Sequence, residues 1–145
     1  MKTLLISACL LGIPCRYNGE ALESIDLDEI KKKYFLVPVC PEIYGGLSTP
    51  REASERMGDL VITNSGRNVT AEYNRGARIA LDFASKFKCN AALLKNNSPS
   101  CGTTSIYDGT FTGKKIAGMG VTADLLRQSG VCVYNESQIN LLLLD

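Results

Sequence analysis

The sequence predicts an α/β fold, a single Rossmann-like three-layer domain spanning residues 1–145 with a mostly parallel sheet and a small hairpin insertion. Short apolar runs without polar alternation recur along the chain, as in strands that are covered on both faces. A helical segment separates the first two runs, and a strand–helix–strand order favours parallel pairing through a right-handed crossover. With 145 residues, 45% of them hydrophobic, the chain has the size of one domain and can bury a core without disulfides.

The first third of the chain alternates between strand and helix. Residues 3–8 form an apolar strand, and residues 9–19 contain the glycine and proline breakers of a long loop. Residues 26–33 have helical spacing and carry lysines in the last turn, where they complement the helix dipole. Residues 35–39 follow as a second strand, and residues 40–51 form a loop rich in turn-forming residues.

The middle of the chain predicts a flap, the longest helix and a third strand. Residues 60–63 and 68–70 flank an Asn-Ser-Gly-Arg turn, which favours a small hairpin or flap. Thr70 is the expected N-cap of a helix whose inner-face residues recur every three or four positions up to Phe87. Residues 91–94 are apolar without alternation, as expected for a strand buried on both faces.

The last third completes the expected sheet. Residues 103–111 contain an Asp-Gly-Thr turn and predict the hairpin insertion. Residues 122–129 form a helix that ends at a glycine. Residues 131–134 are the last parallel strand, and residues 136–144 are a closing helix preceded by a capping box that begins at Asn135.

Composition and charge restrict the partners. Sixteen basic and fifteen acidic residues give a formal charge of +1, so we expect neither a nucleic-acid polymer nor a membrane as a partner. No run approaches the ~18 apolar residues of a membrane span, and the apolar segment before Cys9 is too short for a signal peptide. Six cysteines in a chain of 145 residues are too few for a disulfide scaffold, and free thiols indicate a cytoplasmic protein. The sequence carries no signal of oligomeric state.

Three cysteines lie where predicted strands end. Cys9 and Cys40 come directly after their strands, and Cys101 lies in the small polar loop that follows the third strand. The carboxyl ends of parallel strands meet at one edge of a sheet, and ligands bind at that edge in open α/β folds. We therefore expect the three thiols to converge on one site.

The absence of histidine narrows the chemistry of such a site. Any metal must be held mainly by thiolate, which points to iron–sulfur or zinc. Three thiolates without a fourth protein ligand leave a coordination position open for substrate or water. Cys15 is a fourth ligand, a resolving thiol or a bystander, whereas Cys89 and Cys132 are expected to be buried packing residues.

Several polar residues accompany these cysteines. Glu42 lies two residues after Cys40, so it can approach a metal centre without binding it, although a loop glutamate is more often solvated. Ser98 and Ser100 are either site residues or turn formers. Four further residues are either ligand contacts or solvated side chains: Arg16, Tyr17, Arg51 and Lys95.

Taken together, three groups of motifs resemble the thiouracil desulfidase-like family, formerly a bacterial family of unknown function. They are Ser-Ala-Cys-Leu-Leu-Gly with Arg-Tyr-Asn-Gly (residues 7–19), Cys-Pro-Glu with Gly-Gly-Leu and Pro-Arg (residues 40–51), and Leu-Lys with Ser-Pro-Ser-Cys-Gly (residues 94–102). The motifs span most of the chain in order, and their combination is specific. Asn18 stands where many relatives have aspartate, outside the expected ligands.

The resemblance implies a 4Fe-4S cluster held by Cys9, Cys40 and Cys101, with a fourth iron that binds the sulfur of a small thiolated substrate such as thiouracil. It also implies that Glu42 activates water or moves protons, and that Ser98 assists it. Water then replaces sulfur by oxygen, with release of sulfide and no net redox change. Because one iron is exposed, such a cluster is easily lost in air.

Two alternatives to a desulfidase remain open at this point. The first is a non-catalytic thiolate metal-binding protein, with zinc or a cluster, that acts as a redox sensor or scaffold. The second is a small-molecule binding module whose cysteines are reduced and free of metal. An absorption spectrum with iron and sulfide counts after anaerobic purification separates the interpretations: about four irons favour the desulfidase, zinc alone the thiolate metal-binding protein, and no metal the binding module.

Overall fold

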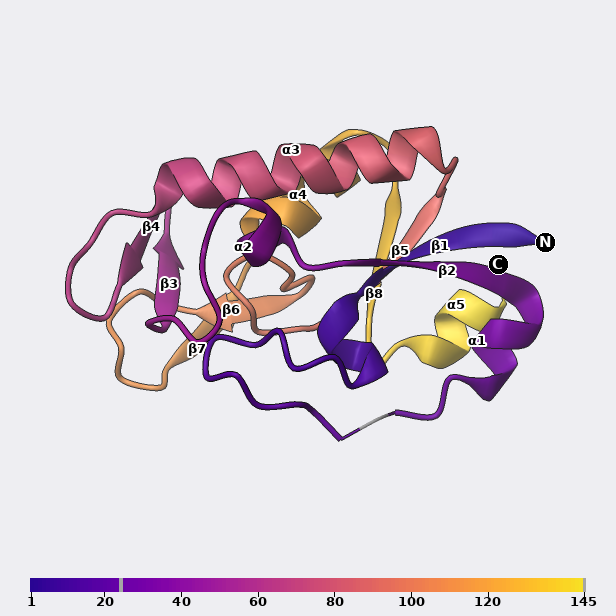
Figure 1. Ribbon diagram of the computed structural model, residues 1–145, viewed down its shortest axis with the longest axis horizontal. Helices are drawn as coiled ribbons and strands as arrows, with labels where there is room; N and C mark the ends of the chain where they lie inside the picture. Colours follow the sequence, from indigo (N-terminus) through magenta and orange to yellow (C-terminus); the bar gives the residue numbers. More distant parts are fainter. Residues whose placement is uncertain (24, 145) are drawn as a thin grey trace.

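A four-stranded parallel sheet forms the centre of the molecule. The computed structural model describes residues 1–23 and 25–144 (Figure 1). The sheet strands, in spatial order, are β2 (Tyr34–Val39), β1 (Lys2–Ser7), β5 (Ala91–Leu94) and β8 (Cys132–Asn135). All three neighbouring pairs are parallel, as the crossover argument predicts.

Helices cover both faces of this sheet (Figure 1). One face packs against α3 (Thr70–Lys86) and α4 (Val121–Gln128), and the other against α1 (Asp28–Lys33) and α5 (Ile139–Leu143). The predicted Rossmann-like α/β class with three layers is therefore confirmed.

Burial on both faces explains the uniform apolar runs. Leu5 and Ala92 belong to the core beneath α3 and α4, whereas Leu4 and Leu93 belong to the core on the side of α1 and α5. Successive side chains of a strand point to opposite faces of the sheet, so the residues at odd and at even positions must both be apolar here. In β5 all four residues are buried, as the sequence predicts.

Two antiparallel hairpins extend the fold beyond the carboxyl ends of β1 and β2 (Figure 1). The first pairs β3 (Ser54–Met57) with β4 (Leu60–Thr63). The predicted hairpin of residues 60–63 with residues 68–70 is also present, on the other side of β4. The N–H of Thr63 donates to the carbonyl oxygen of Arg67 at 2.8 Å, the N–H of Val69 donates to that of Val61 at 2.9 Å, and Ile62 forms an antiparallel bridge with Asn68. The turn between β3 and β4 is tight, and Gly58 in it adopts a φ of 60°, of the kind that a two-residue hairpin requires.

The second hairpin is longer than the sequence predicts. It pairs β6 (Ser105–Tyr107) with β7 (Lys115–Ala117), so the expected return strand at Phe111 is wrong. The N–H groups of Gly109 and Phe111 both donate to Glu55 Oε1, at 3.0 and 3.1 Å. The loop between β6 and β7 is therefore tied to β3.

Several helix boundaries also differ from the prediction. Val69, not Thr70, is the N-cap of α3, because the Thr70 hydroxyl accepts the N–H of Val61 at 2.9 Å. Short helices replace parts of two expected loops, namely η1 (Ala8–Leu11) and α2 (Pro41–Tyr44), which has proline at its first position. Among the described residues, no helix is both long enough and apolar enough to cross a bilayer.

The start of the closing helix departs from the expected capping box. The Gln138 side chain accepts the N–H of Asn135 at 3.0 Å, which is half of that motif. The Asn135 side chain instead accepts the N–H of Ser137 at 2.9 Å. This local turn delays α5, which begins only at Ile139.

Candidate active site at the carboxyl ends of the strands

A cavity of about 340 Å³ lies at the carboxyl ends of β1, β2 and β5. Its volume falls within the range of small-molecule sites, which is about 300–1,000 Å³. Cys9, Cys40 and Cys101 all line it, together with Cys15. The three loops therefore bring the thiols to one cavity, although they lie far apart in the sequence.

The loop that carries Cys101 is fixed by the first turn of α4. The N–H groups of Thr122 and Ala123 both donate to the carbonyl oxygen of Ser100, at 2.8 and 3.1 Å. A Cβ on Gly120 would lie 2.4 Å from the carbonyl carbon of Ser100, so only glycine permits this close approach. Helix α4 thus sets the backbone position of Cys101.

Two glycines bring α2 into backbone contact with α3. A Cβ on Gly76 would lie 1.8 Å from the carbonyl oxygen of Pro41, and a Cβ on Gly45 would lie 2.0 Å from that of Glu72. Side chains at either position would separate the two helices. Because Glu42 follows Pro41, this contact sets how far its carboxylate reaches toward α3.

The Glu42 carboxylate is the centre of a buried hydrogen-bond network. Its Oε1 accepts the Tyr73 hydroxyl at 2.8 Å and Arg51 Nε at 3.1 Å, and its Oε2 accepts the Ser100 hydroxyl at 2.9 Å. The Glu42 and Arg51 side chains are only 14% and 7% exposed. Burial and the neighbouring carboxylate raise the pKa of Tyr73, so its hydroxyl remains a hydrogen-bond donor.

Ser98 is linked to Glu42 through the hydroxyl of Ser100. Its Oγ is 3.0 Å from Ser100 Oγ and accepts the N–H groups of Ser100 and Cys101, each at 3.1 Å. Ser98 therefore shapes the turn before Cys101, while Ser100 contacts the carboxylate directly. Both serines line the cavity, so the structure brings Ser98 and Glu42 to the same site.

The thiols differ in their electrostatic surroundings. Burial raises the pKa of Cys9 to about 11 and that of Cys101 to about 12. The Cys40 thiol donates to the Cys15 carbonyl oxygen at 3.8 Å, and the interaction between the Cys15 and Cys40 side chains lowers the pKa of Cys40 and raises that of Cys15. A metal that binds Cys9 and Cys101 must therefore displace their protons.

Two cations lie close to Cys9. The positive charges of Lys95 and Arg16 both lower the pKa of Cys9, against the larger effect of burial. Lys95 Nζ also forms an ion pair with Glu136 Oε2 at 2.9 Å. Lys95 and Arg16 line the cavity, as does Tyr17, which is 42% exposed.

No group of three histidine, cysteine, aspartate or glutamate side chains surrounds one point as the ligands of a single ion would, within the part of the chain that the structure describes. The thiols instead lie around the wall of a cavity.

A model of the 2-thiouracil desulfurase family matches residues 4–138. The chain belongs to this family. It is 44% identical to the uncharacterized protein YbbK of Bacillus subtilis (strain 168) over 147 residues, which cover 94% of this chain and 97% of YbbK. A solved structure of the [4Fe-4S]-dependent thiouracil desulfidase TudS is also 44% identical, with a TM-score of 0.95 and coverage of 99% of this chain and 97% of TudS.

Family membership confirms the resemblance drawn from the three groups of motifs, and with it the prediction that the protein is an enzyme. The sequence did not decide whether Arg51 contacts a ligand or is solvated. In the structure Arg51 belongs to the hydrogen-bond network around the Glu42 carboxylate, because its Nε donates to Glu42 Oε1. Sequence reasoning missed Tyr73, whose spacing is that of an inward-facing residue on a long amphipathic helix. No local signal identifies its hydroxyl as a partner of Glu42.

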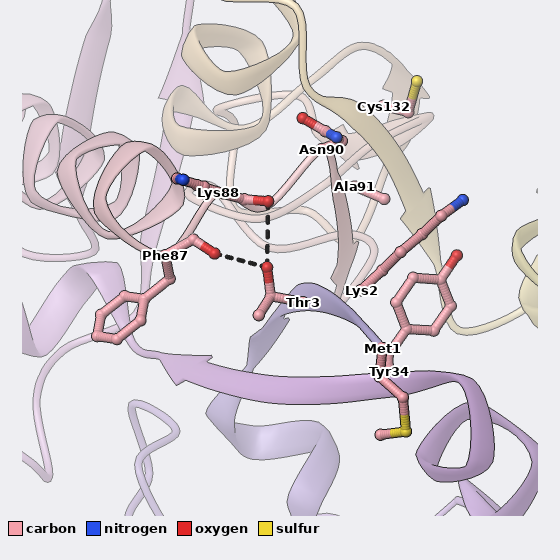
Figure 2. A pocket seen from close by; sticks show the side chains of 9 residues that line it. All are labelled: Met1, Lys2, Thr3, Tyr34, Phe87, Lys88, Asn90, Ala91 and Cys132. Carbon is pink, nitrogen blue, oxygen red and sulfur yellow. Dashed lines mark hydrogen bonds between the residues drawn. The ribbon is translucent and has the colours of Figure 1, made fainter.

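The two cysteines expected to be packing residues behave differently. Cys89 is buried, as predicted. Cys132 is exposed, and the prediction for it is wrong. Cys132 begins the edge strand β8 and lines a second cavity, of about 560 Å³, together with Lys2 and Asn90 (Figure 2). This cavity also includes Thr3 near the start of β1, so it lies away from the candidate active site.

Proposed function

We propose that this member of the 2-thiouracil desulfurase family is a 4Fe-4S-dependent desulfidase. It converts the C=S group of a thiolated nucleobase, or of a similar small thio-compound, to C=O and releases sulfide. The observation that carries the proposal is the presence of Cys9, Cys40, Cys101 and the buried Glu42 carboxylate in the wall of one cavity. The 44% identity to the [4Fe-4S]-dependent TudS over nearly the whole chain supports it.

The donor set fits an iron–sulfur cluster. Iron–sulfur clusters are held by cysteine thiolates, and each cysteine binds a different iron atom, so the sulfurs need not surround a single point. The neighbouring Cys40 raises the pKa of Cys9, and Cys9 in turn raises the pKa of Cys101, as expected of thiols that line one cavity. We assign Cys9, Cys40 and Cys101 as the residues that would hold the cluster.

When bound, such a cluster supplies an iron atom with an open coordination position, which acts as a Lewis acid toward the sulfur of the substrate. The overall reaction is R₂C=S + H₂O → R₂C=O + H₂S, so atoms and electrons balance without an external reductant or oxidant. The protein must therefore activate one water molecule and provide a proton for the departing sulfur.

Glu42 is suited to both proton transfers. As a carboxylate it accepts a proton from the attacking water and then delivers a proton to the departing sulfur, which regenerates the starting state. The Ser100 hydroxyl donates to Glu42 Oε2, so it keeps this oxygen oriented within the wall of the cavity. Ser98 supports Ser100 through the 3.0 Å contact between their hydroxyls.

Lys95 and Arg16 adjust the charge of the site. Three thiolates concentrate negative charge at a largely buried position, which is costly unless cations lie nearby. Both side chains favour the charged form of Cys9. We assign them the role of stabilising the thiolate ligands.

Anaerobic purification followed by metal analysis and an activity assay tests the proposal. The expected result is about four irons and four acid-labile sulfides per chain, with release of sulfide from 2-thiouracil. Zinc alone would support the thiolate metal-binding alternative, and a metal-free protein would support the binding module. Either of these results would overturn the desulfidase proposal.

A further inference from the structure

We propose that Arg51 and Tyr73 are positioning residues that together hold Oε1 of Glu42 and leave Oε2 as the oxygen that exchanges protons. The inference rests on the proposed role of Glu42. In the described part of the chain, Oε1 has two side-chain donors, Tyr73 and Arg51, whereas Oε2 has one, Ser100. The two oxygens of the carboxylate are therefore not equivalent.

Arg51 is itself held from several sides. Its Nη1 donates to the Ser48 carbonyl and to Thr49 Oγ1, both at 3.1 Å, and its Nη2 donates to the Cys15 carbonyl at 3.0 Å. With Nε on Glu42, the guanidinium makes four hydrogen bonds to the protein and is 7% exposed. A planar fork fixed in this way orients its partner carboxylate. Arg51 is thus committed to the protein instead of being free to bind substrate.

Tyr73 approaches the same oxygen from another element. It lies on α3, its side chain is buried, and its hydroxyl donates to Oε1 at 2.8 Å. Arg51 comes from the loop between α2 and β3. Two donors from independent elements prevent the carboxylate from rotating about its terminal bond, which is otherwise a soft torsion.

The arrangement also distributes charge. Two hydrogen bonds, one of them from the charged Arg51, stabilise negative charge on Oε1. Oε2 keeps a single neutral donor and therefore remains the better proton acceptor. Removing either donor from Oε1 should leave substrate binding intact but misplace the oxygen that reacts, and small misplacements of reacting groups cost up to about 100-fold in rate.

Tyr73→Phe and Arg51→Lys test the inference, with Arg56→Lys as the matched control. Tyr73→Phe removes one hydroxyl, and Arg51→Lys keeps the charge but loses the fork. Arg56 is also partly buried in an ion pair, but its partner is Asp124, and Arg56 is not part of the cavity wall. Each variant is compared by its iron content and by kcat and KM for sulfide release. The Glu42 carboxylate is also observed by ¹³C NMR in cluster-free protein labelled at the glutamate carboxyl carbons. The Glu42 resonance is assigned as the one that is missing in Glu42→Gln.

We expect kcat to fall about tenfold in Tyr73→Phe and more in Arg51→Lys, with KM and iron content unchanged. The Glu42 carboxyl resonance should shift in both variants and stay fixed in Arg56→Lys. Unchanged kcat in Tyr73→Phe, or a rise in KM alone, would overturn the inference. If the wild-type protein releases no sulfide, the proposed function fails, but the NMR comparison still decides whether Tyr73 and Arg51 hold the carboxylate: an unshifted Glu42 resonance in Tyr73→Phe contradicts that.

Discussion

Gly76 of α3 lies against the backbone of Pro41 in α2, so closely that a Cβ on the glycine would be 1.8 Å from the proline carbonyl oxygen. Pro41 separates Cys40, an assigned cluster ligand, from Glu42, the assigned proton-transfer residue. One backbone contact therefore sets the position of two functional side chains. Glycine in a helix normally costs stability, so its presence here has a structural reason.

Gly76→Ala should displace α2 and impair the enzyme. Alanine favours helix by about 1 kcal/mol, but the clash with a backbone carbonyl should cost about 1–3 kcal/mol. We expect no net gain in the free energy of unfolding, and at least a tenfold loss of kcat. Asn74→Ala, on the exposed face of the same helix, is the control and should keep full activity. Denaturant unfolding and sulfide release measure both variants, and full activity in Gly76→Ala would contradict the assigned contact.

Cys101→Ser should remove the cluster, whereas Cys15→Ser should retain it. Cys101 is an assigned ligand, but Cys15 contributes a neighbouring thiol and the carbonyl that accepts Arg51 Nη2. Iron and sulfide analysis after anaerobic purification gives the answer directly. Cys132→Ser, at an exposed position, controls for the loss of a thiol. Loss of iron in Cys15→Ser comparable to that in Cys101→Ser would make Cys15 a ligand.

Glu42→Gln should keep about four irons per chain and lose sulfide release by about 10²-fold or more. The amide retains the size of the side chain but cannot accept a proton at its nitrogen position. Glu29→Gln is the control, because Glu29 lies in an exposed ion pair with Lys32. Wild-type rates in Glu42→Gln, or loss of its iron, would show that Glu42 has a different role.

The two serines should respond differently to substitution by alanine. Ser100→Ala removes the donor to Glu42 Oε2 and should lower kcat about tenfold. Ser98→Ala also removes an acceptor for the N–H groups of Ser100 and Cys101, so it should lower the free energy of unfolding by about 1 kcal/mol or more. Urea unfolding and steady-state kinetics separate these effects. Equal unfolding free energies for Ser98→Ala and wild type would argue against the loop role of Ser98.

The central sheet and the convergence of the thiols were predictable because both follow from strand order. Uniform apolar runs indicate strands buried on two faces, and parallel strands place their carboxyl ends at one edge. Cys9, Cys40 and Cys101 reach one cavity for that reason. Residues 60–63 have partners on both sides. The hairpin with residues 68–70 was predicted from its turn, whereas the pairing of β4 with β3 was not.

The partners of Glu42 were not predictable because they depend on how closely two backbones approach. Tyr73 has the spacing of a core residue, and the sequence leaves Arg51 as either a ligand contact or a solvated side chain. Tyr73 meets Glu42 where Gly45 and Gly76 let α2 and α3 touch, and Arg51 reaches the same carboxylate from the loop between α2 and β3. Cys132 is exposed because its strand lies at the edge of the sheet, which an apolar segment alone does not reveal.

The most direct test of desulfuration by water is a turnover of 2-thiouracil in H₂¹⁸O under anaerobic conditions, without added reductant. Mass spectrometry of the pyrimidine product and a sulfide assay are read on the same sample. The reaction proposed here predicts one ¹⁸O atom in each product molecule and one sulfide for each turnover. Unlabelled product, or turnover that requires a reductant, would contradict it.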